Sequence, residues 1–144
     1  MAGKSLADLS EKMRKIDFCM MSTKTSSGVI ANRPMSNNGD TEYDGDSYFF
    51  SYDNTSKITD IDRDPCVTLA FCEAPSMLGR PGMFISIEGK ASLVRDRSMF
   101  DDHWVKDLER WFPQGVETPG LLLIKVQADR LKYWDGEDNG VIEA

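Results

Sequence analysis

The sequence predicts a mainly β (α+β) fold, a six- to seven-stranded antiparallel β-barrel with helices at its periphery. Short stretches with strand character recur along the chain, and most are joined by turn-forming residues. The helical stretches are few and lie between strands without a repeating pattern. With 144 residues and 40% hydrophobic content, we expect residues 1–144 to form a single domain with one core.

The first half of the chain begins with a helical pattern, because Leu6, Leu9 and Met13 recur at helical spacing. The turn signal Thr25–Gly28 then predicts a hairpin between two strands. A polar loop at 37–46 separates this hairpin from the next strand. The predicted elements are a helix at 5–16, strands at 17–25, 29–35 and 47–52, and a helix at 55–63.

The second half alternates more clearly between apolar and polar positions. Gly89 in the middle of a strand predicts a bulge or a close approach by another chain segment. A stripe of Trp104, Leu108 and Trp111 indicates a helix, which Pro113 ends. The predicted elements are strands at 65–72 and 83–94, a helix at 98–112, and strands at 121–126 and 130–134.

The net charge of −7 argues against nucleic acid, whose binding requires a basic surface, and against an anionic membrane. Residues 2–9 lack the pattern of a signal peptide. No run approaches the roughly 18 apolar residues of a membrane span. We therefore expect a cytoplasmic protein without nucleic-acid or membrane partners.

Three cysteines, Cys19, Cys66 and Cys72, lack the close spacing of a metal site. We expect them to be buried structural thiols, with a redox or metal role as the alternative. Cys66 and Cys72 lie an even number of positions apart in one predicted strand, so they should share a face.

Two cations stand out in this acidic chain. Arg33 falls within a predicted strand, and Lys57 falls at the start of a predicted helix. A helix N-terminus carries partial positive charge, so a lysine there is unfavourable unless an anion lies nearby. The hydroxyls of Thr55 and Ser56 and the free N–H groups of the first turn add donors that suit a phosphate. The combination predicts a site for a phosphorylated cofactor.

Each cation also has a simpler explanation. Arg33 pairs with Glu42 or Asp44 at a surface, with Pro34 marking a strand edge. Lys57 forms an i,i+3 pair with Asp60, which is worth only a few tenths of a kcal/mol. For either residue alone the simpler explanation is the better one, and only the pair together favours an anion site.

Aromatic residues are the other candidate ligands. Trp104, Trp111, Phe112 and Trp134 either stack on a flat cofactor or pack in the core or at a dimer interface. His103 is the sole histidine, so neither a histidine-rich metal site nor a Ser-His-Asp triad is supported, and we expect it at an exposed helix position. We assign no catalytic residue and no metal.

Five segments of the chain match a known family in order and spacing. They are residues 17–23, 32–35, 48–51 with 56–57, 87–91, and 111–113 with 133–135. Together they resemble the general stress protein branch of the pyridoxamine 5'-phosphate oxidase-like, FMN-binding split-barrel family. This resemblance covers nearly the whole chain and implies a six-stranded split β-barrel. It also implies a homodimer with FMN in the cleft between subunits.

The resemblance also implies roles for individual residues. The implied phosphate ligands are Arg33, Ser56 and Lys57. The implied backbone contacts to the isoalloxazine ring come from Pro34, Met35 and Ser36, and Ser51 is implied near the ribityl–phosphate region. Trp111 and Phe112, from the partner subunit, would close the ring end, with Trp134 as a further candidate.

The function implied is that of an FMN-dependent oxidoreductase, with FAD as the alternative cofactor and a nicotinamide nucleotide or small molecule as its reaction partner. A non-catalytic module that binds or senses flavin, haem or deazaflavin is the second hypothesis, and a stress protein with a vestigial cleft is the third. Relatives that oxidise pyridoxamine phosphate carry further basic residues in a C-terminal segment. Here residues 137–144 are acidic and lack arginine, which argues against that reaction.

Overall fold

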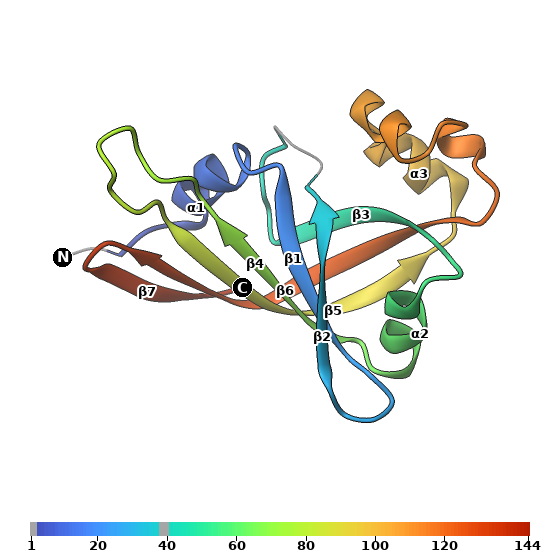
Figure 1. Ribbon diagram of the computed structural model, residues 1–144, viewed down its shortest axis with the longest axis horizontal. Helices are drawn as coiled ribbons and strands as arrows, with labels where there is room; N and C mark the ends of the chain where they lie inside the picture. Colours follow the sequence, from blue (N-terminus) through green and yellow to red (C-terminus); the bar gives the residue numbers. More distant parts are fainter. Residues whose placement is uncertain (1–2, 38–40) are drawn as a thin grey trace.

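The computed structural model of the protein describes residues 3–37 and 41–144, and its centre is one antiparallel sheet (Figure 1). Part of the predicted polar loop, residues 38–40, lies outside the described residues. The strands are β1 (Phe18–Lys24), β2 (Ile30–Ser36), β3 (Asp46–Tyr52), β4 (Cys66–Cys72), β5 (Phe84–Val94), β6 (Leu121–Asp135) and β7 (Asp138–Glu143). The helices are α1 (Leu6–Met13), α2 (Ser56–Arg63) and α3 (Arg97–His103), with 3₁₀ segments η1 (Lys106–Arg110) and η2 (Gly115–Glu117).

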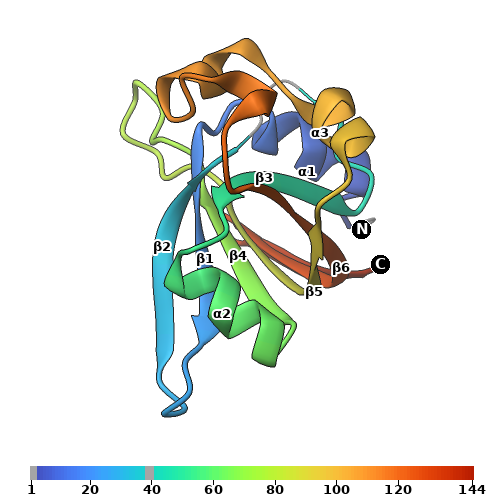
Figure 2. The same ribbon diagram turned by 90° about the vertical axis from the view of Figure 1, so that its right-hand side faces the viewer.

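The sheet has the order β2-β1-β4-β5-β6-β3, and β7 pairs with β6. Every paired neighbour is antiparallel, which confirms the predicted fold class. The strands curve around a common interior (Figure 2). Within the described residues β2 and β3 are the two ends of the path and do not pair with each other. This unpaired junction is the split in the barrel.

The main core fills the inside of this curved sheet. Buried residues alternate along β4, where Val67, Leu69 and Phe71 point inward, as a half-buried strand requires. Helix α2 packs against β1 and β5 and adds Ile58 and Ile61 to the same core. It therefore lies beside the split and helps to cover the barrel interior there.

A second, smaller core lies on the other face of β3. Phe49 belongs to the main core, whereas its neighbour Phe50 belongs to a separate cluster with Phe100, Leu108 and Phe112. Successive residues of a strand point to opposite faces, so β3 is covered on both sides. Helix α3 and the 3₁₀ segments lie together at one end of the molecule, away from α2 (Figure 1), and supply this second cover.

The predicted mid-strand irregularity is confirmed at Gly89. The register of β5 and β6 shifts at Glu88/Gly89, so that Gly89 faces Ala128 and Glu88 faces Arg130, leaving Asp129 as the extra residue. A Cβ atom at Gly89 would lie 2.5 Å from the carbonyl oxygen of Gln127. Glycine therefore allows the two backbones to approach at this bulge.

The long helix predicted at 98–112 is wrong. Helix α3 ends at His103, because Trp104 and Val105 have extended backbone, and η1 follows as a separate 3₁₀ segment. Trp104 and Leu108 still pack in the same apolar cluster. The spacing of the apolar residues was therefore informative about burial but not about helix continuity.

The C-terminal strands also differ from the prediction. The strands expected at 121–126 and 130–134 form one strand, β6, because the polar interruption is the bulge that contains Asp129. β7 is a strand that was not predicted. It folds back on β6 through a two-residue turn, Gly136 and Glu137, in which Gly136 has a φ of 63°. Glycine is favoured at the first position of such a turn because that position requires a positive φ.

The cysteine prediction holds only in part. Cys19 is buried, and burial raises the pKa of its thiol to about 12. Cys66 and Cys72 share a face of β4 as expected, but that face is exposed. The spacing of the two cysteines correctly predicted that they share a face of the strand. It did not reveal that no other part of the described chain covers this outer face of the sheet.

Gly89→Ala is expected to destabilise the fold by about 1–3 kcal/mol, because the added methyl group meets backbone that cannot rotate away. Urea unfolding followed by circular dichroism measures the change. Ser92→Ala, on an exposed position of the same strand, is the control and should change stability by less than about 0.5 kcal/mol. Equal stability of the two variants would show that the bulge relaxes.

Candidate functional site

A cavity of about 240 Å³ lies at the split, between the ends of β2 and β3 and the start of α2. Its floor comes from the two end strands, and its wall comes from η1 and the residues that follow it. Among its lining residues are most of the predicted cofactor ligands: Pro34, Met35, Ser36, Ser51, Thr55, Lys57, Trp111 and Phe112. The structure thus gathers residues from four separate parts of the sequence into one place.

Arg33 lies behind this cavity rather than on its surface. Its Nη1 donates hydrogen bonds to Thr23 Oγ1 at 2.7 Å and to the carbonyl of Met21 at 3.3 Å. Its Nη2 lies 3.8 Å from a carboxylate oxygen of Asp60. The predicted pairing with Glu42 or Asp44 is therefore wrong, since the carboxylate beside Arg33 belongs to α2.

Lys57 is the least compensated cation of the site. It lines the cavity, and in the described parts of the chain no carboxylate lies within ion-pair distance of it. The alternative pair with Asp60 does not form, because Arg33 and Arg63 flank that carboxylate. Burial lowers the pKa of Lys57, and the nearby Arg33 guanidinium lowers it further. A positive charge held in this way favours an anion.

The first turn of α2 faces the same cavity through Thr55 and Lys57. Thr55 occupies the N-cap position, but its side chain makes no capping hydrogen bond. Its hydroxyl instead bonds to the Tyr52 carbonyl at 3.2 Å and lies 3.4 Å from Ser51 Oγ. No acidic residue occupies the first turn. The helix therefore begins without an acidic group of its own, next to a cation. Ser56 is exposed in the same turn and does not line the cavity.

Aromatic side chains form the apolar wall. The Tyr52 ring packs on Phe112 at 4.9 Å, and the Tyr52 hydroxyl donates to the Trp111 carbonyl. Trp111 meets Phe18 edge to face at 6.4 Å. Trp111 is 49% exposed, whereas Phe112 is 5% exposed. Phe112 thus packs in the second core of its own chain and also lines the cavity, and its contact with a partner's flavin stays a prediction.

Several lining residues were not predicted. Phe18, Phe50, Tyr52 and Leu108 belong to the cavity, and Thr23 and Asp60 hold Arg33 from behind. Phe18 could have been suspected from the sequence, because it is a large apolar residue at a strand position that the alternation assigns to the exposed face. The others could not have been, since their role depends on how distant segments meet. Trp104 packs in the second core, and Trp134 is exposed on the outer face.

His103 is the last residue of α3, in a helix as predicted, and its side chain is half-buried. Its ring stacks on Tyr48 with centroids 3.7 Å apart. Within the described ranges, no three histidine, cysteine or acidic residues are grouped to hold a metal ion. The described helices include none that is long and apolar enough to cross a membrane.

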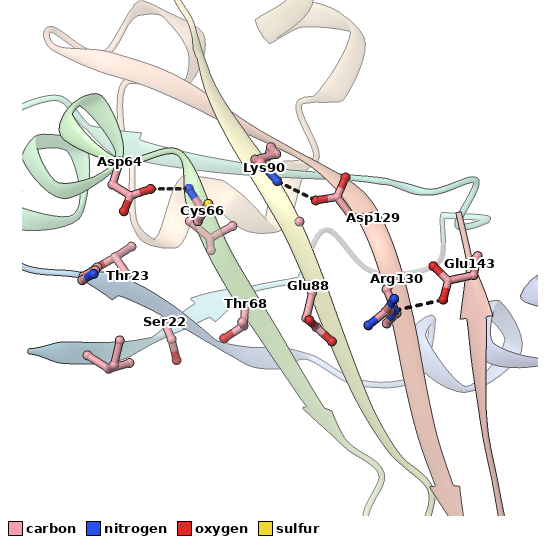
Figure 3. A pocket seen from close by; sticks show the side chains of 14 residues that line it. Ser22, Thr23, Asp64, Cys66, Thr68, Glu88, Lys90, Asp129, Arg130 and Glu143 are labelled. Carbon is pink, nitrogen blue, oxygen red and sulfur yellow. Dashed lines mark hydrogen bonds and ion pairs between the residues drawn. The ribbon is translucent and has the colours of Figure 1, made fainter. Parts of the chain in front are cut away.

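A larger hollow, of about 500 Å³, lies elsewhere, on the outer face of the sheet (Figure 3). Two of its cations, Lys90 and Arg130, are already paired with carboxylates. Lys90 pairs with Asp129 at 2.9 Å, and Arg130 pairs with Glu143 at 3.0 Å. We therefore regard the smaller cavity as the better candidate, because it combines an uncompensated cation with an apolar wall.

The residues at the split fit a phosphorylated flavin chemically. Lys57 and the start of α2 line the cavity and match a phosphate, and the Arg33 guanidinium lies behind them. Phe18, Trp111 and residues 34–36 of β2 form a mostly apolar region of the same cavity. The cavity volume is smaller than the usual range of roughly 300–1,000 Å³ for ligand sites, and the cavity is open at its side. Such a half-site suits a ligand that a second surface also covers.

Comparison with known proteins gives one clear family match: residues 4–144 match the family described as "Pyridoxamine 5'-phosphate oxidase like". Protein bli-3 of Neurospora crassa is 29% identical over 136 residues, covering 88% of this chain and 62% of that protein. The chain thus spans about three fifths of the length of this relative.

Solved structures agree on the fold. A protein from Clostridium acetobutylicum, described as related to general stress protein 26 of B. subtilis, has a TM-score of 0.79 at 14% identity and covers 96% of this chain and 93% of its own. A pyridoxamine 5'-phosphate oxidase-related, FMN binding protein from Nostoc punctiforme has a TM-score of 0.69 at 15% identity, covering 94% and 85%. The family match over nearly the whole length, together with the split sheet, shows that this chain belongs to the pyridoxamine 5'-phosphate oxidase-like family.

Proposed function

We propose that the protein binds FMN in the cavity at the split, with the phosphate at Arg33 and Lys57. The observation that carries this proposal is Lys57, a half-buried lysine beside an arginine at the start of a helix. Burial, the neighbouring guanidinium and the helix N-terminus each disfavour a positive charge on Lys57, and a bound phosphate of charge roughly −2 would compensate all three. The FMN-binding relative from Nostoc punctiforme supports the same cofactor. FAD is the alternative ligand.

The remaining residues would orient the flavin. Pro34, Met35 and Ser36 present β2 backbone to the cavity, and Ser51 and Thr55 present hydroxyls near Lys57. Trp111 and Phe18 would pack against the ring and exclude water from one side. Ser56 would add its hydroxyl or N–H to the phosphate. A bound flavin supplies the redox chemistry, so the chain's own groups need only bind, orient and shield.

We propose further that a second copy of the chain covers the open side of the cavity. Large apolar side chains are exposed on the outer face of the sheet, near the cavity. They are Phe18, Phe84 and Trp134, each between 44% and 47% exposed, and we call them the apolar row. Phe84 faces Cys72 on one side and Trp134 on the other in the strand register. Large exposed apolar side chains gathered in this way mark an interaction surface, and one of them, Phe18, also lines the cavity.

An oxidoreductase function is our first choice, since an apolar, shielded flavin site suits electron transfer to a small molecule. Stopped-flow mixing of the FMN-loaded protein with NADH and with NADPH separates this from a non-catalytic flavin module. Rapid bleaching of the flavin absorbance supports the enzyme. No reduction by either nucleotide favours the binding or sensing role.

Arg33→Ala with Lys57→Ala is expected to abolish the preference for FMN over riboflavin. The parent should bind FMN at least about a hundredfold more tightly, because two charge-assisted contacts to phosphate are involved. Flavin fluorescence quenching gives both dissociation constants. The double variant should bind the two flavins equally, and retention of the parent's preference would refute the phosphate site.

Lys57→Met is expected to stabilise the protein in the absence of ligand by about 0.5 kcal/mol while weakening FMN binding. The folded state holds the pKa of Lys57 below its ordinary 10.5. Between the pKa of the folded state and that of the unfolded chain, the folded protein therefore binds fewer protons. Stability of the parent should therefore rise with pH as the lysine loses its proton. Thermal unfolding between pH 7 and pH 10 should show this rise in the parent and not in Lys57→Met. Lys15→Met, at an exposed position, serves as the control and should keep the rise.

Phe84→Glu is expected to convert a dimer into a monomer and to weaken FMN binding at least tenfold, because it places a charge in the apolar row. Light scattering coupled to gel filtration measures the mass. Gln114→Glu, an exposed change outside the row, should leave both properties unchanged. A monomeric parent that binds FMN would rule out the shared site.

A further inference from the structure

We infer that Thr23 and Asp60 are positioning residues for the anion site: they hold the Arg33 guanidinium in the orientation that receives the phosphate. This inference rests on the proposed function, since it concerns the same anion. It assigns a role to two residues that do not line the cavity and to which the sequence analysis gave no part in the anion site. Both are buried, with 2% and 6% of their surface exposed.

The hydrogen-bond directions in this group follow from chemistry alone. Arg33 Nη1 lies 2.7 Å from Thr23 Oγ1, and a guanidinium can only donate. Thr23 Oγ1 lies 2.8 Å from Asp60 Oδ2, and a carboxylate can only accept. The single hydroxyl proton of Thr23 therefore points to Asp60, and an oxygen lone pair points to Arg33. The hydroxyl is locked in one orientation from both sides.

This arrangement uses the Nη1 atom of the Arg33 guanidinium and leaves the other N–H groups of the guanidinium available. The hydrogen bonds that the described residues accept from Arg33 all leave from Nη1. Nη2 makes only the longer 3.8 Å approach to Asp60. The remaining N–H groups of the guanidinium can then serve a phosphate in paired geometry, which is the strength of arginine as an anion ligand.

Asp60 also ties the phosphate site to two elements. It belongs to α2, whose first turn carries Lys57, and through Thr23 it reaches β1. Arg63 approaches its other carboxylate oxygen at 3.4 Å and donates to the Lys24 carbonyl at 2.6 Å. One carboxylate thus fixes the distance between the strand that supports Arg33 and the helix that presents Lys57. A ligand that must contact both cations depends on that spacing.

A purely structural role makes a different prediction from a positioning role. If Thr23 only joins β1 to α2, its loss lowers stability and weakens FMN and riboflavin alike. If it positions Arg33, its loss weakens FMN and leaves riboflavin binding unchanged, because riboflavin has no phosphate. The ratio of the two dissociation constants therefore separates the roles.

The test compares Thr23→Val, which keeps the branched shape and removes the hydroxyl, with Thr23→Ser, which keeps the hydroxyl. We expect the preference for FMN over riboflavin to fall about tenfold in Thr23→Val, since a hydrogen bond to a charged group is lost. Thr23→Ser should stay within about threefold of the parent. An unchanged preference in folded Thr23→Val would overturn the inference.

Asp60→Asn provides a second measurement should Thr23→Val fail to fold. Removing a negative charge near a bound anion would by itself tighten FMN binding. Loss of the charge-assisted anchor for Thr23 and Arg33 would weaken it. We expect a preference for FMN reduced at least about threefold, and an unchanged or increased preference contradicts the positioning role. A parent protein that does not prefer FMN to riboflavin would instead refute the proposed function itself.

Discussion

The candidate site depends on one constraint of the sheet, which is that its two end strands are not joined to each other. β2 and β3 are the ends of the described strand order, so the backbone at this junction is not used up by a ladder of hydrogen bonds. Helix α2 starts beside the junction directly after β3, and its apolar side chains fill the barrel below it. A fully closed barrel would leave no room for the cavity. The split therefore creates the site, and the local residues only decide what it binds.

Electrostatics determines what kind of ligand suits this opening. The chain as a whole carries a net charge of −7, yet Arg33 and Arg63 share the single carboxylate of Asp60. Lys57 lies near Arg33 with no carboxylate of the described residues within ion-pair distance. Burial makes this local excess of positive charge more costly than it would be in water. Such an arrangement reduces stability in the absence of an anion and is characteristic of sites selected for binding. The acidic remainder of the surface confines the attraction to this place.

Much of the fold could be predicted because it follows from local patterns. The alternation along β4 and β5, the Thr25–Gly28 turn and the mid-strand glycine each gave the element that the structure contains. The failures occurred where tertiary packing overrides local preference. The segment 98–112 keeps its apolar spacing while abandoning the helix at Trp104. β7 was missed because an acidic tail shows little of its strand character until β6 provides an edge for it.

The sequence by itself determined that an acidic β-rich chain carries two misplaced cations, Arg33 and Lys57, next to hydroxyl groups, and it indicated the family to which the chain belongs. Only the tertiary structure decided which groups surround these cations. Asp60 lies far from Arg33 in the sequence, and Phe18 lies far from Trp111, yet the structure brings the members of each pair together. Thr23, from the same hairpin as Arg33, bonds to both Arg33 and Asp60. Strand register and the position of α2 bring them together. These depend on the packing of the whole core, so no short segment contains the information.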